Sequence, residues 1–129
     1  MGLTVRETRP INLNLTTMKF PIMAISSILH RISGVLLFVL FPLMLYFFDM
    51  SLKNAGTFAD VTMWIKDCLL YKFACWLFAS AIVYHLFAGV RHMVMDLGYG
   101  ESVQVGRQTA MAVILLAVIS SLILGIWLW

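Results

Sequence analysis

Three histidines are the side chains in this sequence best suited to bind a metal or a redox group. His85 and His92 are seven residues apart, so a helix would place them on one face, two turns apart. At 1.5 Å of rise per residue, their depths differ by about 10 Å. His30 lies far upstream, next to Arg31. A neutral imidazole nitrogen can bind a metal or haem iron, so these residues are the first candidates for chemistry.

A second polar pair lies on the segment that carries His30. Ser27 and Arg31 are four residues apart, on one helical face that Gly34 continues. A hydroxyl and a guanidinium that converge can hydrogen-bond a carbonyl or an anionic group. The competing interpretation is an arginine that reaches lipid phosphates at the membrane edge. Spacing alone leaves both open.

Asp96 follows Arg91 by five residues and His92 by four. Its carboxylate is expected to form a structural ion pair with one of these two side chains. Met93 and Met95 are expected to pack in apolar surroundings rather than to bind iron.

The composition places all of these residues in a membrane protein. The chain has 129 residues, of which 62% are hydrophobic, and its mean hydropathy is +0.95. Soluble domains are about half apolar, so this chain has too little polar surface to cover itself. Its net charge of +3 is scattered, without a basic stripe with interleaved aromatics, which argues against nucleic-acid binding. Cys68 and Cys75 fit no metal motif and are expected to be buried thiols.

Three long apolar runs predict an all-α integral membrane fold with three helices running up, down and up. The spans are expected at about 22–48, 68–95 and 109–129, each long enough for a hydrocarbon core of roughly 30 Å. Residues 58–65 predict a short interfacial segment. Residues 1–20 are expected to form a polar arm, and residues 21–129 a transmembrane anchor domain.

The distribution of Lys and Arg predicts the orientation. One side holds Arg6, Arg9, Lys19, Arg31, Arg91 and Arg107, and the other holds Lys53, Lys66 and Lys72. Cytoplasmic segments carry the excess of positive residues, so the N-terminus is predicted to be cytoplasmic and the C-terminus periplasmic. The N-terminus has no apolar run before a cleavage site. A multi-pass protein of a bacterial inner membrane is therefore the simplest expectation.

This orientation gives His85 two competing interpretations. If His92 lies at the cytoplasmic interface, His85 lies inside the hydrocarbon, where an ionisable side chain is costly and indicates function. One interpretation is a ligand for a metal or for haem. The other is a neutral histidine that hydrogen-bonds a serine or a carbonyl on another helix.

Two runs of sequence resemble a known family. The first is Arg9-Pro10 followed at a distance by SILHRISG at residues 27–34, and the second is HLFAGVRHMVMDLG at residues 85–98. Together they resemble the cytochrome b membrane-anchor subunits of bacterial succinate dehydrogenase, and the likeness covers the whole chain. Two long, spaced motifs of this kind are specific.

The resemblance implies a subunit of succinate:ubiquinone oxidoreductase that does not itself hold the succinate site. It implies three protein partners: a second small membrane-anchor subunit, an iron–sulfur subunit and a flavoprotein subunit. It also implies one haem b shared between the two anchors. Electrons from succinate would pass through the iron–sulfur clusters to ubiquinone, the substrate at the membrane.

By the same resemblance, His85 matches the axial haem ligand, and the partner anchor supplies the other ligand. Ser27 and Arg31 match residues that line the ubiquinone pocket. His30 and Arg31 also lie where haem propionates would approach, and His92 is expected to contact that site from nearby.

Asp96 matches an acid of the same motif. The resemblance implies for it a role in proton supply or a structural role in orienting Arg91.

Three rival functions stay open. One is a purely structural membrane anchor without cofactor contact, and another is the anchor of a fumarate reductase, which runs in the opposite direction. A small transporter is less well supported, because the sequence shows no internal repeat and no pair of broken helices at the midplane.

Overall fold

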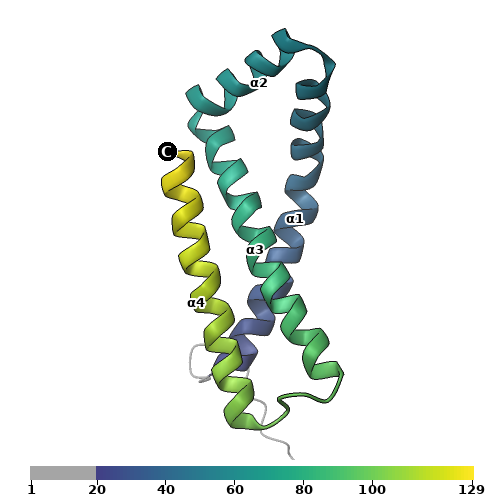
Figure 1. The fold of residues 1–129 in the computed structure, drawn as a ribbon, viewed down its shortest axis with the longest axis vertical. Coiled ribbons are helices and arrows are strands. Elements are labelled where there is room, and N and C mark those ends of the chain that lie inside the picture. The colour runs from purple at the N-terminus through teal and green to yellow at the C-terminus, as the bar shows by residue number, and fades with distance from the viewer. Residues whose placement is uncertain (1–19) are drawn as a thin grey trace, which may run out of the picture.

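The computed structural model describes residues 20–129, which form four helices (Figure 1). They are α1 (Ile22–Lys53), α2 (Ala55–Asp67), α3 (Leu69–Asp96) and α4 (Val103–Leu128). This part of the chain contains no strand. In Figure 1, α1, α3 and α4 run along the long axis, and α2 crosses one end from α1 to α3. The predicted N-terminal arm lies outside the described residues, apart from Phe20.

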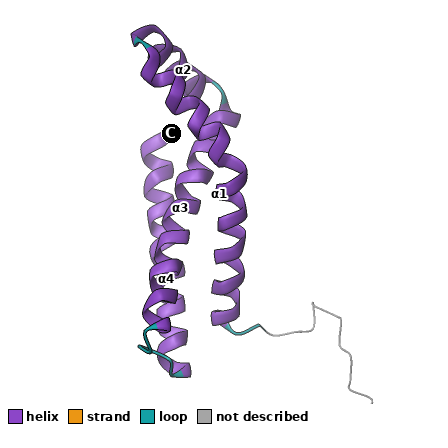
Figure 2. Cartoon of the chain, turned by 90° about the vertical axis from the view of Figure 1, so that its right-hand side faces the viewer, coloured by secondary structure: helices purple, strands orange, loops and turns teal. Residues whose placement is uncertain are grey.

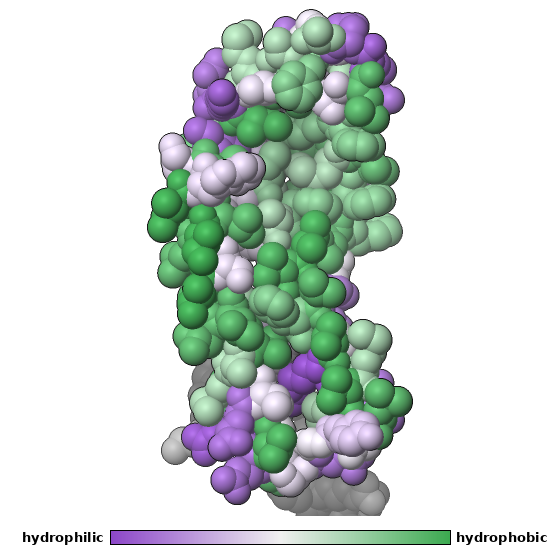
Figure 3. All heavy atoms as spheres, in the orientation of Figure 1, coloured by the Kyte–Doolittle hydropathy of each residue, from purple (hydrophilic) through white to green (hydrophobic). Residues whose placement is uncertain are grey.

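Helices α1, α3 and α4 are each long and apolar enough to cross a membrane. Successive long helices run in opposite directions, up, down and up (Figures 1 and 2). Figure 3 shows a hydrophobic band over the middle of the molecule and hydrophilic residues at both ends. The predicted all-α fold with three membrane-spanning helices is confirmed.

Helix α1 continues past the expected end of its span at residue 48 to Lys53. At 1.5 Å per residue its 32 residues extend about 48 Å, which exceeds a hydrocarbon core of roughly 30 Å. The last turn carries an exposed ion pair between Asp49 and Lys53, with 2.9 Å between oxygen and nitrogen. Helix α1 therefore ends in polar surroundings beyond the membrane core.

Helix α2 is longer than the short segment expected at residues 58–65, because a capping box fixes its start. The Asn54 side chain accepts a hydrogen bond from the Thr57 backbone N–H at 2.9 Å, and the Asn54 N–H donates to Thr57 Oγ1 at 3.2 Å. This reciprocal pair satisfies two N–H groups at the start of the helix. The following residues include exposed charges at Asp60, Lys66 and Asp67.

Helix α4 begins at Val103, so its expected start at Thr109 is wrong. The Ser102 side chain accepts from the Val105 N–H at 3.3 Å and caps the helix. Gly98 and Gly100 turn the chain after α3 with φ of 84° and 76°, in a region that favours glycine. Residues 103–108 include Gln104, Arg107 and Gln108 and are exposed except at Gly106, so they resemble a loop although they form the first turns of a helix.

Helix α3 packs against both α1 and α4 through small residues. Ala74, Ala81 and Ala88 repeat every seven residues on α3, and each is at most 9% exposed. Small side chains let membrane helices approach closely. Between α3 and α4, Trp76 Nε1 donates to the Ser121 carbonyl at 2.9 Å, and the Ser80 and Ser121 hydroxyls are 2.8 Å apart. Helix α3 is the central element that positions the histidines.

Candidate functional site: stacked histidines between α1 and α3

The three histidines come together at the contact between α1 and α3. The His30 ring of α1 lies 4.1 Å from the His85 ring and 5.1 Å from the His92 ring, measured between ring centroids. The ring planes are inclined by 27° and 21°, so both pairs are stacked. The seven-residue spacing on α3 leaves a gap that a ring from α1 fills. The deeper and shallower histidines thus belong to one cluster, which we call the histidine stack (His30, His85 and His92).

A serine of α1 fixes the protonation of His85. Ser33 Oγ donates to the His30 carbonyl oxygen at 2.7 Å and lies 3.0 Å from His85 Nδ1. A serine hydroxyl has one proton, and the His30 carbonyl takes it. His85 Nδ1 must therefore carry its own proton and donate to Ser33 Oγ. In the neutral ring this leaves the Nε2 lone pair free, which is the state that a histidine needs to bind iron.

The sequence left two interpretations of His85 open, an iron ligand and a histidine that hydrogen-bonds a serine. The structure shows that His85 Nδ1 hydrogen-bonds Ser33, and that this bond leaves Nε2 available to bind iron. Ser33 was not singled out, although its position three residues after His30 on a helix was a usable signal.

The other two rings differ in their hydrogen bonding. His92 Nδ1 lies 3.0 Å from the Ala88 carbonyl oxygen of its own helix, to which it donates. His30 Nε2 is buried and has no hydrogen-bond partner within residues 20–129. Buried polar atoms are nearly always paired, so an unpaired one needs an explanation such as an absent ligand.

Glycine gives the His85 ring its space against α1. A Cβ at Gly34 would lie 3.3 Å from His85 Cε1 and 3.8 Å from Nδ1. Such a contact is tight, so a larger residue at this position would push the ring away from Ser33. The sequence placed Gly34 on the face that carries Ser27 and Arg31, and the structure shows that its close neighbour is this imidazole.

A second link joins the same two helices next to the histidine stack. Tyr84 of α3 donates from its hydroxyl to the Ser26 carbonyl oxygen at 2.9 Å, and the Ser26 hydroxyl lies 3.3 Å from the Tyr84 oxygen. Ser26 is fully buried. This pair was not predicted from the sequence, because its partners are 58 residues apart and only the packing of α1 on α3 brings them together.

Ser27 and Arg31 take no part in these contacts. Ser27 is half-buried and Arg31 is exposed, and neither side chain makes a hydrogen bond within the described residues. Their hydrogen-bonding groups are therefore available to a molecule or subunit outside this part of the chain.

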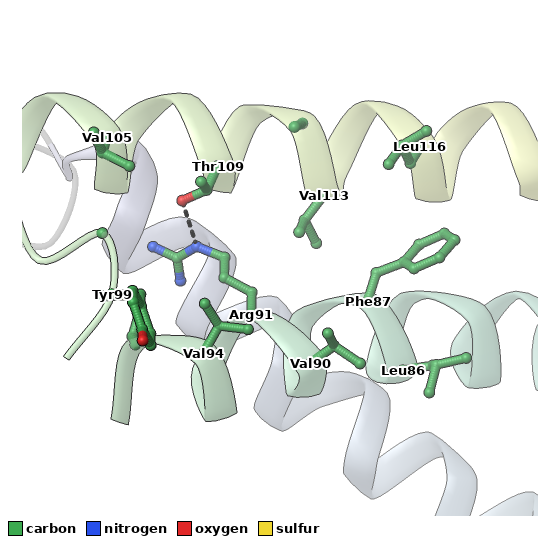
Figure 4. A pocket seen from close by; sticks show the side chains of 13 residues that line it. Leu86, Phe87, Val90, Arg91, Val94, Tyr99, Val105, Thr109, Val113 and Leu116 are labelled. Atoms are coloured by element: carbon green, nitrogen blue, oxygen red, sulfur yellow. Dashed lines mark hydrogen bonds between the residues drawn. The ribbon is translucent and has the colours of Figure 1, made fainter. Parts of the chain in front are cut away.

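Arg91 and Asp96 do not form the expected ion pair. Asp96 is exposed at the end of α3, and within residues 20–129 it pairs with neither Arg91 nor His92. Arg91 is instead buried against α4, where Nε donates to Thr109 Oγ1 (Figure 4) and Nη2 donates to the Gly106 carbonyl, both at 3.1 Å.

The histidine stack does not form a complete metal site. Nowhere in residues 20–129 do three or more His, Cys, Asp or Glu side chains come together to hold a metal ion. Imidazole lone pairs lie in the ring plane, so stacked rings cannot point at a common ion. The geometry suits one histidine that acts as a ligand, with two others beside it.

Three apolar helices and a half-buried cluster of histidines near one end of them define a polytopic membrane protein with a candidate cofactor site. Residues 5–124 match the family model described as succinate dehydrogenase/fumarate reductase transmembrane subunit. The chain belongs to this family, which confirms the resemblance seen in the sequence.

Individual relatives agree with the family match. The succinate dehydrogenase cytochrome b556 subunit of Coxiella burnetii is 44% identical over 121 residues, which cover 94% of this chain and 97% of the relative. The cytochrome b556 subunit of Rickettsia typhi is 31% identical and covers 97% of this chain and 94% of its own length. The mitochondrial cytochrome b560 subunit of Mus musculus is 32% identical, over 89% of this chain and 69% of the relative.

Proposed function

We propose that this chain is the haem b-binding membrane anchor of a succinate dehydrogenase and contributes to its ubiquinone-reduction site. The observation that carries the haem assignment is the hydrogen-bond relay from His85 through Ser33 to the His30 carbonyl. That relay leaves a bare imidazole nitrogen on a membrane helix. The relatives, which are named as cytochrome b subunits of succinate dehydrogenase, supply the complex and the kind of haem.

The residues present fit a haem. His85 would bind the iron through Nε2, while Ser33 holds the ring in the tautomer that this requires. The unpaired His30 Nε2 offers a buried polar contact beside it, where a propionate would find a partner. His30 and Arg31 are the proposed propionate contacts, and His92 supports the stack from the other side. A haem b bound here supplies one-electron transfer.

The second axial ligand is proposed to come from another small anchor subunit. His30 and His92 are stacked in this chain rather than opposed across a gap. Within residues 20–129 no other histidine is present to complete the iron coordination. A haem at His85 would therefore be shared between two chains.

The ubiquinone site is proposed to use Ser27 and Arg31, whose side chains make no hydrogen bond within residues 20–129. The Ser27 hydroxyl would donate to one quinone carbonyl. Arg31 would stabilise the negative charge that develops on the oxygen as the ring is reduced. Reduction to the quinol takes two electrons, delivered through the iron–sulfur subunit, and two protons. The exposed Asp96 at the same end of the bundle is proposed to supply protons or to order that surface.

This end of the bundle is proposed to face the cytoplasm of a bacterial cell, with the chain in the inner membrane and its C-terminus periplasmic. The excess of positive residues on that side supports this orientation. The iron–sulfur and flavoprotein subunits would dock on the cytoplasmic side. The family model covers both succinate dehydrogenases and fumarate reductases, and the names of the relatives favour the succinate direction.

Deleting this chain tests its role as an anchor. Succinate oxidation with an artificial dye is expected to move from the membrane fraction to the soluble fraction, because the catalytic subunits lose their attachment. Expression of the wild-type chain should return the activity to the membranes. Dye-coupled succinate oxidation that stays membrane-bound without the chain would contradict the anchoring role.

A further inference from the structure

A large apolar groove lies between α3 and α4, and none of the residues that line it belongs to α1 or α2. Its volume is about 720 Å³, within the range of roughly 300–1,000 Å³ typical of ligand pockets. Its walls include Leu86 and Val90 of α3 and Val113 and Leu116 of α4 (Figure 4). The histidine stack does not line it, so it is distinct from the proposed haem site.

One end of this groove carries a positive charge without a counter-ion. Arg91 lines the groove and is only 9% exposed. Its two hydrogen bonds go to neutral acceptors, Thr109 Oγ1 and the Gly106 carbonyl, and no carboxylate of residues 20–129 pairs with it. A guanidinium has five N–H donors and stays charged, and within residues 20–129 its Nη1 has no acceptor. A buried unpaired charge is costly, so an anion is expected to meet it.

The groove runs from the membrane edge towards the middle of the bilayer. Arg91 lies near the end of α3, close to the polar turn that contains Tyr99, which also lines the groove. Leu116 lies seven residues beyond Thr109 along α4, about 10 Å deeper. An occupant must therefore carry an anionic group at headgroup level and a long apolar part below it.

We propose that this groove binds one anionic phospholipid, with its phosphate on Arg91 and an acyl chain along the walls formed by α3 and α4. The match of charge and polarity carries the proposal: a single cation at the shallow end and apolar side chains at every deeper position. The groove is separate from the proposed haem and quinone sites, and its test measures bound lipid rather than enzyme activity.

Native mass spectrometry of the purified complex tests the proposal. The complex is stripped of lipid and then offered, in separate samples, phosphatidylglycerol or diacylglycerol, which has the same acyl chains and no phosphate. We expect one phosphatidylglycerol per chain and a preference for it of about tenfold, the effect of one charge-assisted hydrogen bond. Arg91→Gln should remove the preference, and Arg91→Lys should keep most of it. Equal retention of both lipids by the wild-type complex would overturn the proposal.

A steric variant tests the groove without touching the charge. Ala112 lines the groove, so Ala112→Phe should fill it and lower retention of phosphatidylglycerol. Val118→Phe is the matched control, because Val118 is 51% exposed on the same helix and does not line the groove. Lipid retention that is the same in the two variants would place the lipid elsewhere.

A photo-crosslinking side chain at Leu116 identifies the occupant directly and does not depend on the folding of any Arg91 variant. Capture of phospholipid supports the proposal, and capture of a partner polypeptide overturns it.

The haem spectrum of Arg91→Gln gives a further check. An unchanged spectrum supports the proposal, whereas loss of haem with lipid retained would assign the guanidinium to a haem propionate instead.

Discussion

His85→Ala is expected to remove the low-spin b-type haem signal from the purified complex, because the iron loses one of its two imidazole ligands. Ser33 orients His85 alone, and the His30 and His92 rings remain stacked on each other between α1 and α3, so neither is placed to replace the lost ligand. The measurement is the reduced-minus-oxidised absorbance spectrum, normalised to flavin. Haem that stays bound through other groups should show a high-spin spectrum, so the shape of the band is read as well as its size.

A milder substitution and a control test the same prediction. Ser33→Ala keeps the ligand but removes the group that orients it, and such a change typically costs about 10- to 100-fold in metal affinity. Leu86→Ala is the matched control, because Leu86 adjoins His85 but is 59% exposed to the lipid side. A wild-type spectrum in His85→Ala, unchanged in position and amplitude, would show that His85 is not the ligand.

Ser27→Ala and Arg31→Leu are expected to lower ubiquinone reduction while succinate oxidation with an artificial dye persists. The reason is that neither side chain is used within residues 20–129, so their loss should leave the fold intact. A neutral hydrogen bond contributes about 0.5–1.5 kcal/mol, so Ser27→Ala should slow the reaction roughly 2- to 10-fold. A hydrogen bond from a charged group contributes about 1.5–3 kcal/mol, so Arg31→Leu should slow it roughly 10- to 100-fold.

Arg107→Leu is the control for charge at this end of the bundle, because Arg107 is also exposed but lies on α4. It should leave both activities unchanged. The ratio of quinone-coupled to dye-coupled activity is the relevant quantity, because it separates the quinone site from the succinate site. Unchanged quinone reduction in both Ser27→Ala and Arg31→Leu would refute this assignment.

The helices were largely predictable from the sequence, and their ends were not. Long apolar runs have few structural solutions in a membrane, so the three spans follow directly from composition. The start of α4 was missed because the cap at Ser102 and the exposed polar turns after it look like a loop.

Only those features of the site that depend on a single helix were predictable from the sequence. His85 and His92 share a face of α3 because of their spacing, which local geometry gives. The position of the His30 ring between them depends on how α1 packs on α3, which no local pattern encodes. The same is true of the buried Arg91, whose hydrogen bonds reach α4. Ser27 and Arg31 were assigned by family resemblance, and their role stays a prediction.

Affinity purification of the tagged chain from membranes, with subunit identification and a haem spectrum on the same sample, tests whether this chain is a haem-binding anchor of succinate dehydrogenase. We expect it to bring down the flavoprotein, the iron–sulfur subunit and a second small anchor, together with one haem b per chain. A chain that purifies without the dehydrogenase subunits, or a complete complex without a reduced b-type band, would contradict it.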